Sequence, residues 1–470
     1  MIDVAPSSTD RVLRSRRVIQ TAALQGPACV VVRDGRIAAI EPWDAPLAVT
    51  DELGELALLP GLVDTHVHVN EPGRTDWEGF RSATRAALAG GITTIVDMPL
   101  NSVPATTSAV ALRAKVRAMA GQLHCDVGLW GGVVPGNAED LPALAEAGAL
   151  GFKCFLAPTG VDEFAHVTEA DLRVAMPAVV AAGLPLLVHA EDPERLRSLP
   201  ASTRRYADWL ASRPPEAEAS AIRLVARLGR EFGGRIHIVH VASTAAVDAL
   251  DEARRRPDAL ALLTGETCPH YLAFAAEDIA DGATAFKCAP PIRGRAEARS
   301  LARALFSGRL QLIASDHSPA PPALRDLERG DFARAWGGIA SLECSLGASW
   351  SALVRGGLAI DDAGLGSLAA WMSAWPAELA RLEISKGAIL VGRDADLVAF
   401  DPDEEWIVDP AKLHQRHPVT PYAGGTLRGR VHATWLRGAL VVRDGNVMDE
   451  LRGRWLRSGG EAVDPARAFA

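Results

Sequence analysis

The sequence contains no long apolar run, no CxxC pair and no Gly-Lys dipeptide. No stretch approaches the ~18 consecutive apolar residues of a membrane-spanning helix. The basic segment Arg11–Arg17 precedes an apolar stretch that polar residues and Pro27 interrupt, so it does not resemble a secretory signal. Without Gly-Lys there is no phosphate-binding P-loop. The six cysteines are scattered, which excludes a disulfide framework and a zinc ribbon and is typical of a cytoplasmic protein.

An excess of charge of one sign is lacking as well. The 470 residues include 49 Lys and Arg against 58 Asp and Glu, for a net charge of -9. A mildly acidic surface gives no electrostatic reason to expect nucleic acid or an anionic membrane as partner. With 48% hydrophobic and 23% charged residues, the chain has the balance of an enzyme-sized globular protein with a large core. The composition predicts a soluble cytoplasmic protein.

Short apolar, β-branched runs alternate with segments rich in Ala, Arg and Glu through the middle of the chain. Eight such runs are Leu58–Thr65, Gly91–Met98, Cys125–Gly131, Ala149–Leu156, Leu184–His189, Arg235–Val241, Ala259–Thr267 and Leu310–Asp316. Helices are expected between them, for example at Asp76–Ala89 and Glu216–Phe232. An eightfold strand–helix alternation favours an α/β fold with a closed parallel (β/α)8 TIM barrel. A doubly wound open sheet is the alternative.

Both ends of the chain have short β segments joined by turns. Three hairpins are expected: Cys29–Arg33 with Arg36–Ile40, Ala388–Val391 with Ala395–Phe400, and Thr434–Arg437 with Ala439–Arg443. Neither end has enough strands for a stable sheet of its own. We therefore expect one small β-sandwich built from residues 1–57 and 387–450, with the barrel at 58–386 inserted between them. Residues 451–470 show weak patterning, which predicts a mobile tail.

Four histidines stand where strands are expected to end. His66 and His68 are two residues apart, so on a strand both imidazoles point to the same face, a spacing that suits two ligands of one metal ion. His189 and His240 end the fifth and sixth strands. Each histidine could instead be a hydrogen-bonded buried side chain. Their joint placement at the ends of barrel strands, where the chemistry of this fold gathers, favours metal ligation.

Lys153 closes the apolar run Ala149–Phe152, where an ammonium group would be buried at high cost. A desolvated lysine has a lowered pKa and a neutral amine that can react. One interpretation is an ion pair with Asp97 or Glu191. The other is carboxylation by carbon dioxide, because a carbamate is anionic and its two oxygens can bridge two divalent ions ~3.5–4 Å apart.

Asp316 ends the eighth strand. Its carboxylate could bind a metal ion through one oxygen and take a proton from water through the other, which would make it a metal ligand and the catalytic residue. A helix N-cap is the alternative, disfavoured by the prolines that follow. His237 and His317 are expected to face away from the site, and His270 could line its mouth. The other histidines are expected to be structural: His124, His166, His414, His417 and His432.

His66, His68, Lys153, His189, His240 and Asp316 together resemble the ligand set of the amidohydrolase superfamily. The resemblance spans about residues 55 to 400 and is to the binuclear cyclic-amidase branch, which includes dihydroorotases, hydantoinases, dihydropyrimidinases and allantoinases. Within the branch, several segments resemble allantoinases, among them residues 66–80, 90–102, 151–156, 266–272, 286–293, 315–319 and 336–339. We find no departure from that pattern at a position expected to do chemistry.

Asn70 argues against the dihydroorotases. In those enzymes an arginine two residues after the second strand-one histidine pairs with the substrate carboxylate. An amide cannot neutralise a carboxylate but can hydrogen-bond a neutral urea group, which suits allantoin. Arg74 and Arg293 remain available, so this exclusion is incomplete. Cys268 and Cys288 have no histidine patterned as a base, which disfavours a thiol nucleophile.

The resemblance implies that the protein hydrolyses the hydantoin ring amide of the small molecule allantoin to allantoate, in purine or ureide degradation. It implies two divalent ions, zinc first, with cobalt, manganese or iron also compatible with such ligands. His66 and His68 would hold one ion, His189 and His240 the other, and carboxylated Lys153 would bridge them. Asn70, Asn101, Cys288 and Pro290 are the expected substrate contacts. A homotetramer or homodimer is implied. A hydantoinase or dihydropyrimidinase activity is the runner-up, and a dihydroorotase or a non-catalytic scaffold is disfavoured.

Overall fold

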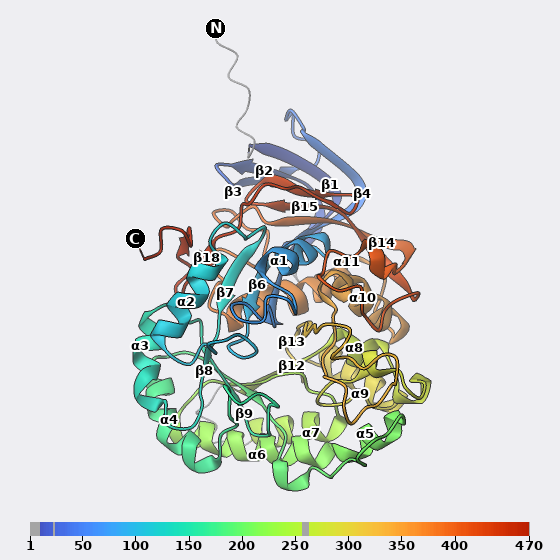
Figure 1. Cartoon of the computed structure of the whole chain (residues 1–470). Coiled ribbons are helices and arrows are strands. Elements are labelled where there is room, and N and C mark those ends of the chain that lie inside the picture. Colours follow the sequence, from blue (N-terminus) through green and yellow to red (C-terminus); the bar gives the residue numbers. More distant parts are fainter. Residues whose placement is uncertain (1–9, 22–23, 256–262, 470) are drawn as a thin grey trace.

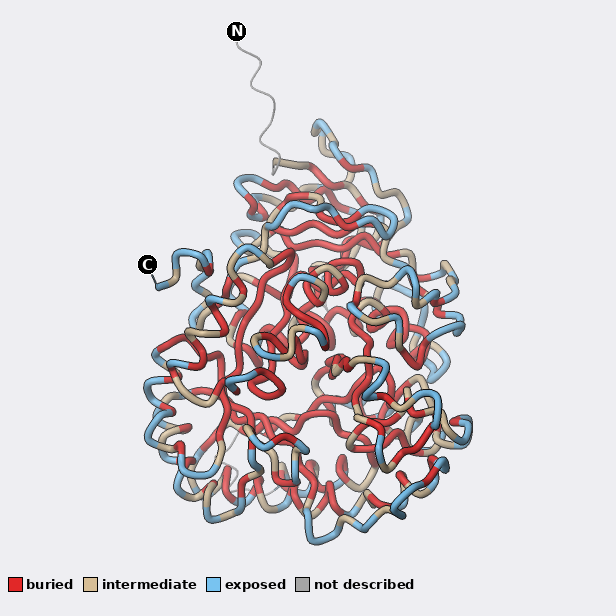
Figure 2. The backbone as a smooth tube through the Cα atoms, in the orientation of Figure 1, coloured by how far each residue is buried: buried red, intermediate tan, exposed pale blue. Residues whose placement is uncertain are grey.

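The computed structural model describes residues 10–21, 24–255 and 263–469. Figure 1 shows a mixed α/β body in which helices surround the central strands, with a layer of terminal strands above it. Buried residues follow the central strands, whereas exposed residues lie on the outer helices and loops (Figure 2). Within the described ranges, none of the helices combines the length and apolar character needed to span a bilayer.

The strands of the central body pair in parallel. One group pairs in the order β8 (Gly131–Gly132), β9 (Phe152–Phe155), β10 (Leu186–His189), β11 (Ile236–Ile238), β12 (Leu263–Thr267) and β13 (Leu312–Ile313). A second group pairs in the order β5 (Leu62–Val67), β6 (Ile92–Asp97) and β7 (Asp126–Leu129). An isolated parallel bridge joins Val67 of β5 to His317, just after β13. Each of the eight expected runs thus contains a parallel strand, although residues 259–262 of the seventh lie outside the described ranges.

Helices follow these strands in turn. The surrounding helices are α1 (Phe80–Ala89), α2 (Ala109–Met119), α3 (Leu141–Glu146), α4 (Glu169–Ala181), α6 (Pro215–Phe232), α7 (Thr244–Arg254) and α9 (Arg295–Phe306). Helix α6 shows why they form. Pro215 begins it, where a missing N–H is tolerated, and Gly233 ends it at φ 78, a left-handed conformation that glycine adopts without strain. Its buried face includes Ile222 and Val225, so packing on the strands stabilises the helix.

Further helices lie in the loops and after the last strand. They are α5 (Tyr206–Ser212), α8 (Pro269–Ala273), α10 (Ser345–Arg355), α11 (Asp362–Ala369) and α12 (Trp375–Leu379). The last three fall within the segment after Asp316, and α11 and α12 are joined by a π-helical turn at Ala370–Ala374.

The terminal strands form one continuous hydrogen-bonded sheet rather than two separate sheets. Its order is β17 (Asn446–Val447), β16 (Ala439–Arg443), β15 (Thr426–Leu436), β14 (Leu397–Ile407), β4 (Asp51–Pro60), β1 (Arg11–Thr21), β2 (Leu24–Arg33) and β3 (Arg36–Pro42). The two ends meet where β14 pairs with β4. Side chains from both ends, such as Val30 and Trp435, share one apolar cluster. The expected hairpin arm at Ala388–Val391 is not a strand. Gly387 and Gly392 flank it at positive φ, which turns the chain away from extended pairing.

Residues 451–469 are not an unstructured tail, which corrects the sequence expectation. β18 (Trp455–Leu456) pairs in parallel with β7 through Trp455 and Val127, and pairs with β19 (Ala462–Val463). Trp455 and Leu456 are almost completely buried. Two apolar residues in an otherwise polar stretch are a weak sequence signal, yet their burial is enough to dock the segment on the central body.

A buried ion cluster joins the terminal sheet to the central body. The Nζ atom of Lys386 lies 2.7 Å from Asp126 Oδ2 of β7, 2.9 Å from Asp394 Oδ2 and 2.7 Å from Asp396 Oδ2. Arg437 adds a second cation, 2.5 Å from Asp126. The carboxylates come from two separate stretches of chain, β7 and residues 394–396, so the cluster ties these stretches to each other.

Candidate metal centre

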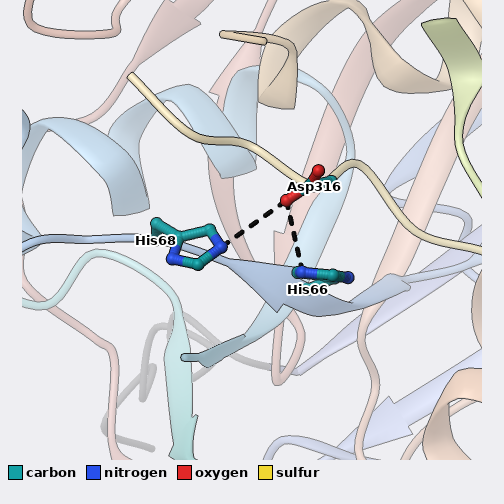
Figure 3. Close-up of side chains that lie close together, drawn as sticks. All are labelled: His66, His68 and Asp316. Atoms are coloured by element: carbon teal, nitrogen blue, oxygen red, sulfur yellow. Dashed lines mark ion pairs between the residues drawn. The ribbon is translucent and has the colours of Figure 1, made fainter. Parts of the chain in front are cut away.

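His66, His68 and Asp316 converge at the C-terminal ends of β5 and β13. The Nε2 atoms of His66 and His68 lie 3.2 and 3.5 Å from Asp316 Oδ1 (Figure 3). One ligand atom from each residue lies within 4.8 Å of the others, and all three side chains are buried. Alternation along β5 places both imidazoles on the face that Asp316 approaches. The three residues could therefore hold one metal ion.

His189 and His240 form a second pair beside them. His189 Nδ1, at the end of β10, lies 3.0 Å from His240 Nε2, two residues after β11. The His66 ring centroid lies 5.6 Å from that of His68 and 5.4 Å from that of His240. The four imidazoles therefore form one cluster contributed by three parallel strands.

Two buried carboxylates accept hydrogen bonds from imidazoles of this cluster. His66 Nδ1 lies 2.5 Å from Glu266 Oε1, and His189 Nε2 lies 2.7 Å from Glu191 Oε2. Arg213 donates to Glu191 at 2.5 Å. Burial alone would raise the pKa of both carboxyls, but Arg213 and His189 lower that of Glu191 to about 2, and His66 and His237 lower that of Glu266 to about 2. Both groups are therefore anions that accept the histidine N–H.

Burial sets the charge of the imidazoles themselves. It lowers the pKa of His68 and His189 and lowers that of His240 well below its usual range. Burial would raise the pKa of Asp316, but His66, His68 and His240 hold it well below its usual range. Burial thus favours neutral imidazoles at His68, His189 and His240 and the contacts favour an ionised Asp316, which are the protonation states that bind divalent ions.

Lys153 in β9 is completely buried, and its Nζ has no hydrogen-bond partner among the described residues. The ammonium lies 4.9 Å from the centre of the Phe155 ring, which stacks on His189 at 4.6 Å. Burial lowers the pKa of Lys153 to about 8. Neither ion pair considered from the sequence forms, because Asp97 pairs with Lys115 and Glu191 with Arg213.

The donor set fits divalent metal ions. It combines imidazole nitrogens with a carboxylate, the ligands that zinc and similar ions prefer. The unpartnered amine of Lys153 beside His189 is costly as it stands. Its conversion to a carbamate would supply the additional anionic ligand that a second ion requires.

Left-handed backbone is concentrated at this site. Asn70, Asn101, His240 and Asp316 have φ values of 67, 65, 41 and 47 degrees. For non-glycine residues such conformations cost of order 1–3 kcal/mol each and gather at functional sites. The surrounding contacts therefore hold these side chains in positions that an unstrained backbone would not give them.

Asn70 and Asn101, two of the expected substrate contacts, stand in the loops after β5 and β6. Asn70 Nδ2 donates to the carbonyl of Pro319 at 3.4 Å, and its buried Oδ1 has no partner among the described residues. Arg74 links Asn70 to Asn101, since its backbone N–H donates to the Asn70 carbonyl and its Nη1 to the Asn101 carbonyl. The structure thus brings the loops after β5 and β6 together.

Cys288 and Pro290 follow α8 and are held through their carbonyls. Trp209 Nε1 donates to the Cys288 carbonyl at 2.9 Å, and the Tyr271 hydroxyl donates to the Pro290 carbonyl at 2.7 Å. Burial, together with the charge of Asp316, raises the pKa of the Cys288 thiol to about 12. A protonated, buried thiol is a poor nucleophile, so a thiolate mechanism does not fit this site.

Sequence reasoning missed the contacts made by His237 and Glu266. His237, expected to face away from the site, is linked to His66 through Glu266, since its Nε2 lies 3.0 Å from Glu266 Oε2. His317 does face elsewhere, because its Nδ1 accepts the backbone N–H of Ser341 at 3.0 Å. His270 is buried without a hydrogen-bond partner among the described residues, and burial lowers its pKa to about 4. The available signal for Glu266 was a charged residue at the end of an otherwise buried strand.

Comparisons with known proteins cover nearly the whole chain. The sequence pattern of the Amidohydrolase family matches residues 57–441. An allantoinase of Streptomyces avermitilis is 47% identical over 454 residues, which is 96% of this chain and 99% of that protein. An allantoinase of Arabidopsis thaliana is 42% identical over 84% of this chain and 79% of that protein. The solved structure of L-hydantoinase (dihydropyrimidinase) from Arthrobacter aurescens is 28% identical, covers 95% of this chain and 100% of its own, and superposes with a TM-score of 0.87.

Proposed function

The chain belongs to the amidohydrolase family, and we propose that it hydrolyses the hydantoin ring amide of allantoin to give allantoate. It is a hydrolytic cyclic amidase, with identities of 40–47% to several allantoinases over most of its length. The observation that carries the reaction is the buried cluster in which His66 and His68 meet Asp316 beside the pair His189 and His240. Hydantoinases share the fold at lower identity, 28% in the example above.

A closed (β/α)8 barrel at residues 58–386 supports this site. Parallel pairing runs from β8 to β13 and from β5 to β7, and the bridge from Val67 to His317 brings the two groups together. In such a barrel the C-terminal strand ends meet over one mouth. The proposed domains are this barrel and a β domain formed by residues 1–57 and 387–450, to which β18 adds a contact.

Two divalent ions, zinc in the first place, would bind here, with cobalt, manganese or iron as alternatives. His66, His68 and Asp316 would hold one ion and His189 and His240 the other. Such ions would lower the pKa of a water molecule toward neutrality and polarise the attacked carbonyl. Lys153 would bridge the ions as a carbamate. Its neutral Nζ forms a bond to the carbon of carbon dioxide and releases one proton, which leaves one negative charge on two oxygens.

Asp316 is the proton carrier. Its Oδ1 contacts His66, His68 and the Ser318 hydroxyl, which leaves Oδ2 to accept the proton of the attacking water. The same oxygen would then donate that proton to the leaving ring nitrogen. Contacts with the imidazoles hold the pKa of Asp316 low, so the carboxylate is ionised before the reaction and its protonated form is acidic enough to donate to the leaving nitrogen.

Charge around the mouth favours a neutral substrate. Arg74 pairs with Glu163, and Arg293 pairs with buried Glu218 at 2.6 Å. Both arginines that could have received a substrate carboxylate are thus neutralised by the protein itself. Asn70, with a buried and unpartnered Oδ1, is suited to a urea N–H. This arrangement supports allantoin over dihydroorotate, and Asn101, Cys288 and Pro290 would complete the substrate contacts.

The test is ring opening of allantoin, dihydroorotate, hydantoin and dihydrouracil by the zinc-loaded protein, measured side by side. The proposal requires turnover of allantoin at a kcat/KM well above those of the others. A preference for hydantoin or dihydrouracil would replace the substrate with that of the hydantoinases. A protein that binds no metal and opens no ring would instead be a non-catalytic scaffold.

The remaining proposals concern the cell and the assembly. All six cysteines are unpaired and buried, as in proteins of a reducing cytoplasm, which supports a cytoplasmic location. A homotetramer or homodimer is proposed from the resemblance to the cyclic amidases, and analytical ultracentrifugation would test it.

A further inference from the structure

Glu266 lies one residue before the end of β12, the one strand from β9 to β13 that supplies no proposed metal ligand. Its side chain is completely buried, and its carboxylate hydrogen-bonds to His66, His237 and the backbone of His240. A buried carboxylate is retained at high cost unless its hydrogen bonds are satisfied. The question is therefore what the carboxylate holds in place.

Its first contact is with the ring of His66. Oε1 lies 2.5 Å from His66 Nδ1, so that nitrogen carries the proton and the lone pair of Nε2 faces Asp316. Oε2 is held by His237 Nε2 at 3.0 Å, and His237 Nδ1 is held by Thr264 Oγ1 at 2.8 Å. The carboxylate thus has a fixed orientation that is imposed on the ring of His66.

Its second contact is with the backbone of His240. Oε1 accepts the His240 N–H at 3.3 Å, and the Glu266 carbonyl accepts the Val241 N–H at 2.8 Å. His240 has a φ of 41 degrees, a conformation that persists only when neighbouring contacts hold it. Glu266 therefore contacts the proposed ligands of both ions, whereas Glu191 contacts the side chain of His189 alone among them.

We propose that Glu266 is the positioning residue that couples the two halves of the metal centre. It sets the tautomer and orientation of His66 and holds the strained backbone that aims His240. The inference rests on the proposed function, because it takes His66 and His240 as metal ligands. Carboxylates behind metal-binding histidines commonly change metal affinity or activity about 10–100-fold.

The experiment compares Glu266→Gln with Glu218→Gln in the full-length protein. Glu218 is also buried, and it accepts the Ala242 N–H at 2.9 Å in the same loop as His240, but it touches no proposed ligand. The zinc dissociation constant of each variant is measured by competition with a chromophoric chelator in bicarbonate buffer. We expect a rise of about 10–100-fold for Glu266→Gln and little change for Glu218→Gln. At saturating zinc, Glu266→Gln should lower kcat for allantoin with little change in KM.

Thr264→Val provides a second variant that leaves the charge in place. It removes the hydroxyl that holds His237, so it should raise the zinc dissociation constant in the same direction but less than Glu266→Gln. Thermal melting of the metal-free proteins separates folding from binding. Equal zinc affinities for Glu266→Gln and Glu218→Gln would overturn the inference, as would a wild-type protein that binds no zinc. If the wild type binds zinc but leaves allantoin intact, the proposed substrate fails and the zinc comparison still decides the inference.

Discussion

Lys386→Met should destabilise the protein at the junction between the terminal sheet and the central body. The ammonium has 1% side-chain exposure and lies within 2.9 Å of the carboxylates of Asp126, Asp394 and Asp396. Methionine keeps a flexible apolar side chain in the space but removes the charge. Removing one partner of a buried ion pair costs about 3–5 kcal/mol, because the remaining charges stay buried. We expect the free energy of unfolding to fall by about 4 kcal/mol at pH 7.

The pH dependence of that loss identifies its cause. Burial would raise the pKa of Asp126 in the wild type, but Arg437 and Lys386 lower it to about 2. The ionised Asp126 carboxylate therefore stabilises the folded state above the pKa that it has in the unfolded chain. This stabilisation is constant from pH 5 to 7 and is lost only as the pH falls through about 2. In the variant, burial without the ammonium raises the carboxyl pKa values, so the folded state binds the extra proton. The free energy of unfolding of the variant should then rise by up to about 1.4 kcal/mol for each pH unit by which the pH falls.

Urea unfolding at pH 7 and pH 5 measures both effects. At its melting temperature, a chain of 470 residues has an unfolding entropy of about 1 kcal/mol/K. A loss of about 4 kcal/mol should therefore lower the melting temperature by about 4 °C. Lys412→Met is the surface control, since Lys412 is 83% exposed and should change stability by less than about 0.5 kcal/mol. Asp394→Asn in the Lys386→Met background should recover part of the loss. A loss that is equal at the two pH values, or below about 1 kcal/mol, would refute the reasoning.

Three further predictions concern the site. Lys153→Ala should abolish metal retention and activity, which metal analysis and turnover would show. A short carboxylic acid and bicarbonate should partly restore both. Full activity in this variant would contradict the proposed carbamate. Removal of metal by a chelator should abolish allantoin hydrolysis, and added zinc, cobalt or manganese should restore it; unchanged turnover in metal-free protein would rule out the metal role. Glu163→Gln removes the charge that neutralises Arg74, so dihydroorotate should inhibit allantoin turnover several-fold more strongly than in the wild type. An unchanged inhibition constant would show that Arg74 does not face the substrate.

The parallel strands were predictable because their signal is local. A buried parallel strand is an apolar run between helical segments, and runs such as Leu184–His189 contain little else. Several strands are shorter than their runs; β13, for example, covers only Leu312–Ile313 of the run Leu310–Asp316. The strand expected at Ala388–Val391 does not form, because Gly387 and Gly392 turn the chain on either side of it. The short strand at Trp455 was not predicted, because two apolar residues are too few to show a periodic pattern.

His66 and His68 are two positions apart, and that spacing alone predicts both imidazoles on one face of a strand. The same reasoning placed His189, His240 and Asp316 at strand ends, and the family resemblance supplied their roles. These placements could be predicted from the local sequence, because the direction of each side chain along a strand follows from the pleat of the strand.

Tertiary structure alone decided which charges meet. Glu266 lies 200 residues from His66 in the sequence, and neither its distance to that ring nor the burial of both can be read from local pattern. The same holds for Lys115 with Asp97, Glu163 with Arg74, and Lys386 with its three carboxylates. The sequence by itself determined the family, the parallel strands of the central body and the candidate metal-binding residues. The fold decided which of these residues hydrogen-bond to a buried carboxylate, which form ion pairs and which have no partner among the described residues. The reason is that electrostatic energies depend on distance and burial in space rather than on separation along the chain.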